Sequence, residues 1–268
     1  MSSAALRRTA PPGGLAQAGV VLLLLALAGG AWALTDRRMG GMDAGPGSEL
    51  GGLGWFAVTW ALMMAAMMLP AVSPTVAAYR RRAAGPGATA AFAAGYLVTW
   101  LAAGLLGYAL VEGVRSLELG LLAWDEAGRY VAGGVILGGA LYQLTEPKDA
   151  CLRRCRDPRA FLTEHWRPGR LGALRMGMEH GGFCVACCWA LMASLFALGI
   201  MSIGWMALVA ALIAAERLLP WKTIAVRGVG VMLALLALAV AFAPEDVPGL
   251  TIPGSHQGAP SMDSMEMH

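Results

Sequence analysis

The residues with the clearest chemistry in this chain are three cysteines that follow a histidine in the stretch "HGGFCVACCWALM". On a helix, His180, Cys184 and Cys187 fall on one face, within about 60° of each other. Cys184, Cys188 and Met192 form an i, i+4 ladder on the same helix. Imidazole, thiolate and thioether ligands select Cu(I), Zn(II) and other soft metals over Mg²⁺ or Ca²⁺. The stretch therefore predicts a soft-metal site, although small cysteines also pack well in helices.

Two further cysteines, Cys151 and Cys155, precede this stretch at a spacing of i, i+4. They lie in a polar segment, residues 146–180, and whether they fold back toward the other thiols stays open. Five cysteines are an odd number, which favours free thiols or metal ligands over a disulfide framework. Glu216 lies near the end of an apolar segment, beside Arg217. It could ligate a metal, take a proton or pair with Arg217.

Methionine is the second source of soft ligands, since thioethers bind Cu(I) and bind harder ions poorly. Four of the 16 methionines form two i, i+4 pairs in one apolar segment: Met63, Met64, Met67 and Met68. We predict that they hold an ion at mid-depth, although methionine is also an adaptable packing residue. A tract near the end of the chain resembles segments that capture copper in oxidising compartments, with candidate ligands Met262, Met265, Met267 and His268. Plain disorder is the alternative for this tail.

Apolar segments must position these ligands. The chain is 57% hydrophobic and 14% charged, whereas a soluble domain is about 25% charged. Seven runs approach the roughly 20 residues that a membrane-spanning helix needs. They cover residues 14–35, 54–79, 88–111, 127–145, 181–203, 204–220 and 226–243. The sequence predicts an all-α fold, a polytopic membrane helix bundle of about seven transmembrane helices, with a six-helix core and an N-terminal helix.

Three regions follow from this pattern. Residues 1–52 form an N-terminal transmembrane helix or signal anchor with an outer loop, residues 53–244 form the helix bundle, and residues 245–268 form a tail. The "AWA" at 31–33 resembles a signal-peptide cleavage site, so removal of the first helix is an alternative. In the second apolar run, Pro70 should kink the helix or end its regular part.

Basic residues give the bundle an orientation. With the N-terminus inside, the outer face receives Arg37, Arg38, Arg115 and Arg129, which leaves 16 of the 20 basic residues inside. The positive-inside rule then places the N-terminus in the cytoplasm and the tail outside. The basic residues cluster at helix ends without interleaved aromatics, so we expect the lipid bilayer, and not a nucleic acid, as a partner.

Four motifs resemble those of an uncharacterised bacterial family that is described as predicted metal-binding integral membrane proteins. They are "MMAAMMLP" at 63–70, "CLRRCRDP" at 151–158, "HGGFCVACCWALM" at 180–192 and "GIMSIGWM" at 199–206. The resemblance covers about residues 53–222 and implies a metal-binding protein of the bacterial inner membrane, with a periplasmic tail.

The chain departs from that family at two positions. Members commonly have an acidic residue and a lysine where this chain has Glu216 and Arg217, so the charge is kept. They often have an asparagine where Ser202 stands, which leaves any role for a side-chain amide in doubt. The N-terminal helix and the Met/His tail lie outside the resemblance.

The function we favour is the binding and transfer of a soft metal, with Cu(I) preferred and zinc, mercury or another soft ion as rivals. The tail would capture the ion, the methionines would hold it, and the cysteines would receive it for a metallochaperone or metalloenzyme partner. We expect a transfer protein and not an enzyme. The phosphate-binding pattern G-x-x-x-x-G-K-[ST] does not occur, which argues against a pump with its own ATPase domain.

Two alternatives stay open. Cys184 and Cys187 form a Cys-x-x-Cys at the predicted start of a helix, where the helix dipole lowers thiol pKa values, so a membrane thiol-disulfide oxidoreductase is one. Cys151 and Cys155 would then be a shuttle pair. The other is an assembly factor without chemistry of its own. An ion lost with the cysteines would favour metal transfer, whereas a redox-active disulfide without an ion would favour the oxidoreductase.

Overall fold

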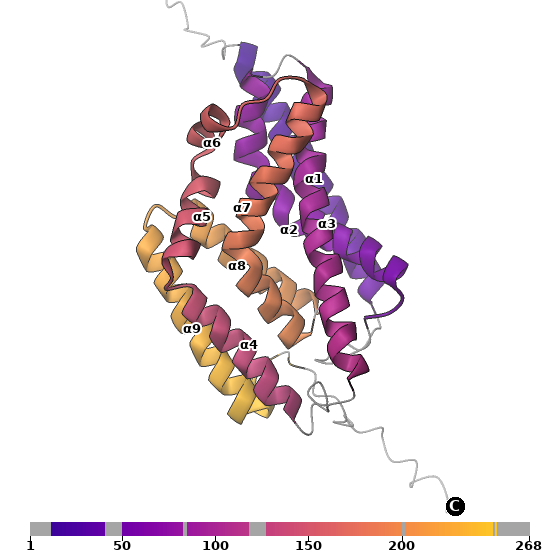
Figure 1. Ribbon diagram of the computed structural model, residues 1–268, viewed down its shortest axis with the longest axis vertical. Helices are drawn as coiled ribbons and strands as arrows, with labels where there is room; N and C mark the ends of the chain where they lie inside the picture. The colour runs from indigo at the N-terminus through magenta and orange to yellow at the C-terminus, as the bar shows by residue number, and fades with distance from the viewer. Residues whose placement is uncertain are drawn as a thin grey trace, which may run out of the picture.

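The computed structural model of the chain describes residues 12–40, 50–82, 85–117, 127–199, 202–248 and 250. These residues form α-helices and one short 3-10 helix, and no strand occurs among them (Figure 1). The α-helices are α1 (Pro12–Met39), α2 (Leu53–Arg82), α3 (Pro86–Ser116), α4 (Arg129–Tyr142), α5 (Glu146–Arg156), α6 (Pro158–Glu164), α7 (Gly169–Leu198), α8 (Ile203–Leu218) and α9 (Lys222–Phe242). The 3-10 helix is Pro244–Asp246. The predicted all-α helix bundle is confirmed.

Within the described residues, five helices are long and apolar enough to cross a membrane. They are α1, α2, α3, α7 and α9. The other two apolar helices are shorter, with 14 residues in α4 and 16 in α8. At 1.5 Å per residue, α4 is about 21 Å long, whereas the hydrocarbon core of a bilayer is about 30 Å thick. The seven apolar runs therefore all contain helices, but only five of these helices have the length of a full span.

The helix α7 lies at the centre of the bundle, where it packs against α3, α4, α5 and α8 (Figure 1). Glycines allow its closest contact, with α3. A Cβ atom on Gly177 would overlap the Phe92 carbonyl, and one on Gly95 would overlap the Leu174 carbonyl. The helices α4 and α9 run side by side, and α1 packs along α2. The middle of α7 is thus enclosed by other helices.

The polar segment 146–180 is mostly helical, and the helix predicted to begin near residue 181 begins earlier, at Gly169. It contains α5, α6 and the first part of α7. Three prolines divide it: Pro147 in the first turn of α5, Pro158 at the start of α6, and Pro168 just before α7. Proline is tolerated there because the first N–H groups of a helix have no partner within the helix.

The helix α2 passes through Pro70 and continues to Arg82, with Pro74 also inside it. Pro74 has no N–H to donate to the Pro70 carbonyl one turn earlier. The Ser73 hydroxyl donates to that carbonyl instead, at 2.8 Å. The helix continues past both prolines, and a neighbouring hydroxyl satisfies the carbonyl that Pro74 leaves free.

Candidate metal centre

Three thiols of α7 meet inside the bundle. The Sγ atoms of Cys184, Cys187 and Cys188 all lie within 4.8 Å of one another, and all three side chains are buried. The sulfurs of Cys187 and Cys188 are 3.4 Å apart, and the Cys187 thiol donates to the Cys184 carbonyl at 3.2 Å. Several converging soft sulfur ligands at this spacing fit one thiophilic ion.

A fourth thiol comes from α5. The Cys155 sulfur lies 3.7 Å from that of Cys187 and is buried. A hydrogen bond to the Cys184 sulfur, together with burial, raises the pKa of the Cys155 thiol. Cys155 is held here because Asp157 ends α5 and begins α6, where its carboxylate accepts from the backbone N–H groups of Arg159 and Ala160 at 3.1 and 3.0 Å. The sequence left this approach open, and the structure brings Cys155 to the three thiols.

A guanidinium from α8 lies against the sulfurs. The Arg217 Nη2 atom donates to Cys184 Sγ at 2.7 Å and lies 3.6 and 3.8 Å from the sulfurs of Cys187 and Cys188. The Tyr96 hydroxyl, from α3, is 3.0 Å from Cys184 Sγ. A positive group and a hydrogen-bonding hydroxyl both stabilise negative charge on sulfur. Sequence spacing gave no sign of either partner.

Beside the thiols lies a buried ion pair. Lys148 Nζ is 2.6 Å from Glu216 Oε2, both side chains are 1% exposed, and Nζ also donates to the Cys187 carbonyl at 2.6 Å. Glu216 therefore pairs with Lys148, and not with its neighbour Arg217. Burial alone would lower the pKa of Lys148, but its electrostatic interactions with Cys188 and Glu216 and its hydrogen bond to Glu216 raise it overall. The pair fixes α5, and with it Cys155, to α7 and α8.

Sequence reasoning missed Lys148, although a signal was present. The buried residues of α5 are Lys148, Leu152 and Cys155, at spacings of i, i+4 and i+7. That pattern marks one helix face directed at a core. A lysine on such a face requires a buried partner, because an unpaired charge is costly to bury.

His180 lies one turn before Cys184 on α7 and is fully buried. Both of its ring nitrogens are without a hydrogen-bond partner among the described residues. Aromatic rings surround it: its centroid lies 4.8 Å from Phe161, 6.0 Å from Tyr96 and 6.1 Å from Phe92. A buried polar group without a partner is rare and calls for an explanation, and a metal ion is one. The group of mutually close ligand atoms, however, contains the three thiols and not His180.

The remaining predicted ligands are placed as follows. Met192 and the four methionines of α2 are buried in the core. Cys151 is half-buried on α5, one turn before Cys155. The tail ligands Met262, Met265, Met267 and His268 lie outside the described residues.

Two details of the motifs gain a physical explanation. Cys184 lies in the middle of α7, so the oxidoreductase alternative loses the helix start on which it depended.

The Ser202 hydroxyl accepts from the Trp205 N–H at 3.5 Å and caps the start of α8. Asparagine caps helices equally well, which accounts for either residue at this position without an amide-specific role.

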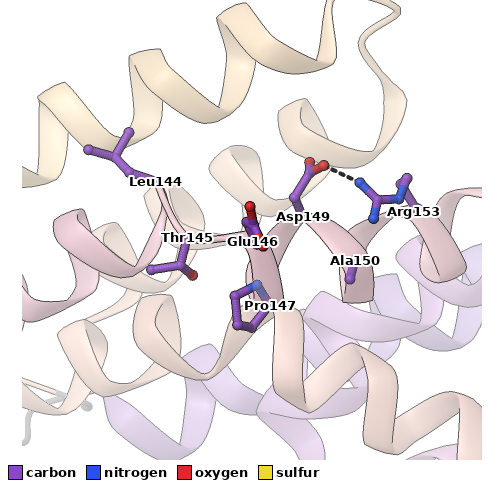
Figure 2. A pocket seen from close by; sticks show the side chains of 7 residues that line it. All are labelled: Leu144, Thr145, Glu146, Pro147, Asp149, Ala150 and Arg153. Carbon is purple, nitrogen blue, oxygen red and sulfur yellow. Dashed lines mark hydrogen bonds and ion pairs between the residues drawn. The ribbon is translucent and has the colours of Figure 1, made fainter.

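A pocket opens at the junction of α4 and α5 (Figure 2). Its lining residues include Glu146 and Asp149, and Figure 2 shows Asp149 paired with Arg153. None of the cysteines lines it. The candidate metal centre is therefore a buried side-chain cluster and not this surface pocket.

The fold and the site together define an α-helical membrane bundle with a buried group of soft-metal ligands. The PpoB2 copper chaperone family matches residues 57–240, which is more than half of the chain. The chain belongs to that family. The match runs from α2 into α9 and leaves out α1. Neither a curated protein nor a solved structure matches the chain. Membership agrees with the metal-binding family that the motifs resemble.

Proposed function

We propose that this protein binds Cu(I) at Cys184, Cys187 and Cys188 and passes it to a partner protein. The observation that carries the proposal is the mutual approach of the three buried sulfurs within 4.8 Å. Sulfur ligands favour Cu(I), and membership in a copper chaperone family favours copper over zinc or mercury. The partner is a metalloenzyme or a second chaperone that accepts copper from thiols.

Cys155 is the fourth sulfur of the proposed site. It lies on a different helix from the other three and is 3.7 Å from Cys187. A ligand on a second helix lets the site change its number of sulfurs without unfolding α7. Such a change is useful for transfer, because an ion that must leave is better held by ligands that can be withdrawn one at a time.

Aromatic contacts show which residues of α2 lie level with which residues of α7 along the helix axes. The rings of Trp60 and Phe196 have centroids 5.3 Å apart. Nearer the other end of α2, Tyr79 stacks on Phe92 at 5.0 Å, and Phe92 is 6.1 Å from His180. The two helices therefore run in opposite directions, and equal numbers of residues along each keep them roughly level.

By this register, Met67 and Met68 come to about the height of Cys188, and Met64 to about the height of Met192. Met64 thus lies nearer the outer side than the cysteines, and Met67 and Met68 lie level with Cys188. These positions support a path on which thioethers take the ion from the outer side and thiols receive it. Thiolates bind soft ions more strongly than thioethers, so affinity would increase along the path. The tail, with Met262, Met265, Met267 and His268, would begin the path in the periplasm of a bacterial inner-membrane protein.

The proposal is tested by anaerobic Cu(I) titration of detergent-purified protein against a chromophoric competitor. The wild type should take about one Cu(I) per chain from the competitor. A Cys184/Cys187/Cys188→Ser variant should leave the Cu(I) on the competitor. A Trp189→Ala variant, changed at an exposed neighbouring position of α7, is the matched control and should bind like the wild type. Absence of binding by the wild type would sink the proposal, and a redox-active disulfide would then favour the oxidoreductase.

A further inference from the structure

We infer that Arg217 makes the thiol site selective for a monovalent soft ion, because its guanidinium exchanges places with the ion. The inference rests on the proposed function and deepens it. It concerns whether the site prefers a monovalent or a divalent ion.

The guanidinium of Arg217 lies against all three sulfurs. A single nitrogen, Arg217 Nη2, is within 3.8 Å of all three sulfurs, and the sulfurs are within 4.8 Å of one another. Their lone pairs therefore converge on the space that this nitrogen takes. An ion bound by the same sulfurs needs that space, so Arg217 must withdraw when the ion enters.

Little besides the sulfurs holds the guanidinium in place. Among the described residues, the Nε and Nη1 atoms of Arg217 have no hydrogen-bond partner, although the side chain is only 8% exposed. Arg217 is the penultimate residue of α8, and Leu218 and Leu219, which follow it, are exposed. A long side chain at a helix end can reach the polar surface while its aliphatic part stays buried. The Arg217 side chain therefore has only a short distance to move from the sulfurs to the polar surface.

Charge decides which ion can replace the guanidinium. Arginine is always protonated in proteins, so its withdrawal removes one positive charge from the site. Cu(I) restores that charge, and the swap involves no change of oxidation state. Each thiol that becomes a thiolate ligand releases its proton to solvent, and because the same release accompanies either ion, Cu(I) and Zn(II) differ at the site by one positive charge. The adjacent charges do not alter this balance, because Lys148 and Glu216 already cancel each other. A divalent ion would add a second positive charge in a poorly screened interior, and the withdrawn guanidinium would still repel it.

The test is the ratio of Cu(I) to Zn(II) affinity, measured by competition in detergent under anaerobic conditions. In Arg217→Gln, Zn(II) binding should strengthen relative to Cu(I) by about tenfold or more, since one charge of repulsion is gone. Arg217→Lys keeps the charge and should keep a ratio near that of the wild type. Arg227→Gln, at an exposed position of α9, is the matched control and should leave the ratio unchanged.

A second measurement uses the wild type alone and does not depend on a variant that folds. Phenylglyoxal modification, read by peptide mass spectrometry, should increase severalfold at Arg217 when Cu(I) is bound and stay constant at Arg227. An unchanged affinity ratio in Arg217→Gln, or unchanged reactivity of Arg217, would overturn the inference. Both outcomes leave the proposed function intact if the wild type binds Cu(I), whereas failure of the wild type to bind Cu(I) would refute the proposed function itself.

Discussion

The buried pair of Lys148 and Glu216 is the residue-scale contact on which the assembly of the site depends. Removing one member of a buried ion pair leaves an uncompensated charge in the interior. We therefore expect Lys148→Met to lower the free energy of unfolding by about 3–5 kcal/mol, measured by denaturant titration in detergent. Combining it with Glu216→Leu should restore much of the loss, because an apolar pair leaves no buried charge.

The same helix supplies a control. Arg153 and Asp149 form an ion pair on the exposed side of α5, with side chains 61% and 41% exposed. Exposed pairs contribute about 0–1 kcal/mol, so Arg153→Gln should change stability little. Since the pKa of Lys148 is raised above 10.5, its contribution is fully present below that pH and is lost as the pH rises through the higher value. An equal effect of both substitutions at neutral pH would contradict this account.

Cys155 and Cys151 offer a second comparison at the residue scale. Only Cys155 has its sulfur against the three thiols of α7. We expect Cys155→Ser to weaken Cu(I) binding by at least about 10–100-fold, the typical cost of losing even an outer-shell partner of a metal ligand, and Cys151→Ser to leave it unchanged. Competitive Cu(I) titration measures both. Equal losses in the two variants would place Cys151 in the site as well.

Residue spacing predicted the clustering of the thiols on one helix, but not their partners on other helices. The i, i+3 and i+4 intervals among Cys184, Cys187 and Cys188 are local, so helix geometry was enough to bring the thiols together. Arg217 and Tyr96 reach Cys184 from α8 and α3, and such contacts depend on how helices dock. No interval in the sequence encodes that docking, so these partners appeared only in the structure.

At the scale of elements, the close packing of α3 on α7 sets the position of the site. A Cβ atom on Gly177 would overlap the Phe92 carbonyl of α3, whereas Gly182 on α7 has open space around it. We expect Gly177→Ala to cost about 1–3 kcal/mol of stability, because backbone must move to make room. Thermal unfolding in detergent measures the change.

Gly182→Ala is the matched control for that substitution. It places the same methyl group on the same helix without a clash, so stability should stay level or increase by up to about 1 kcal/mol. A neutral Gly177→Ala variant would show that α3 and α7 can separate freely, and it would contradict the tight packing.

Element boundaries were the least predictable part of the fold. The apolar runs located α1, α2, α3 and α9, because long apolar stretches have one stable arrangement in a bilayer. The start of α7 at Gly169 was missed because its first turns are polar and basic, and hydropathy does not distinguish a polar helix from a loop. Pro70 was predicted to kink α2 or to end its regular part, but the helix continues through it to Arg82, because a proline inside an apolar helix is tolerated when neighbouring groups satisfy the freed carbonyls.

At the scale of the whole molecule, the distribution of arginine and lysine predicts the orientation. We expect an alkaline phosphatase fusion after residue 268 to be active, since this enzyme folds only outside the cytoplasm and the tail is predicted outside. A fusion within residues 165–168, between α6 and α7, should be inactive, because the predicted orientation has α4 crossing the membrane before this segment although it is shorter than the five long helices. Activity of the second fusion without the first would reverse the orientation and the proposed direction of copper movement.

The helix bundle as a whole could be predicted from composition, but the enclosure of the site could not. Composition predicted an all-α membrane protein because the chain is rich in apolar residues and poor in charged ones, and its apolar residues form runs of near 20. Enclosure of the thiols depends on α5, a polar helix that docks through Lys148 and through Arg156, which donates to the carbonyls of Glu216 and Leu219 at 2.5 and 2.6 Å. These contacts are long-range and specific.

The proposed function requires that the sulfurs of α7 hold one Cu(I). X-ray absorption spectroscopy of the Cu(I)-loaded protein reports on this binding, because the first coordination shell distinguishes sulfur from nitrogen and oxygen. We predict about two or three sulfur ligands in the wild type, and loss of the copper with Cys184/Cys187/Cys188→Ser. A shell of nitrogen or oxygen, or a sulfur shell that survives in that variant, would contradict the claim.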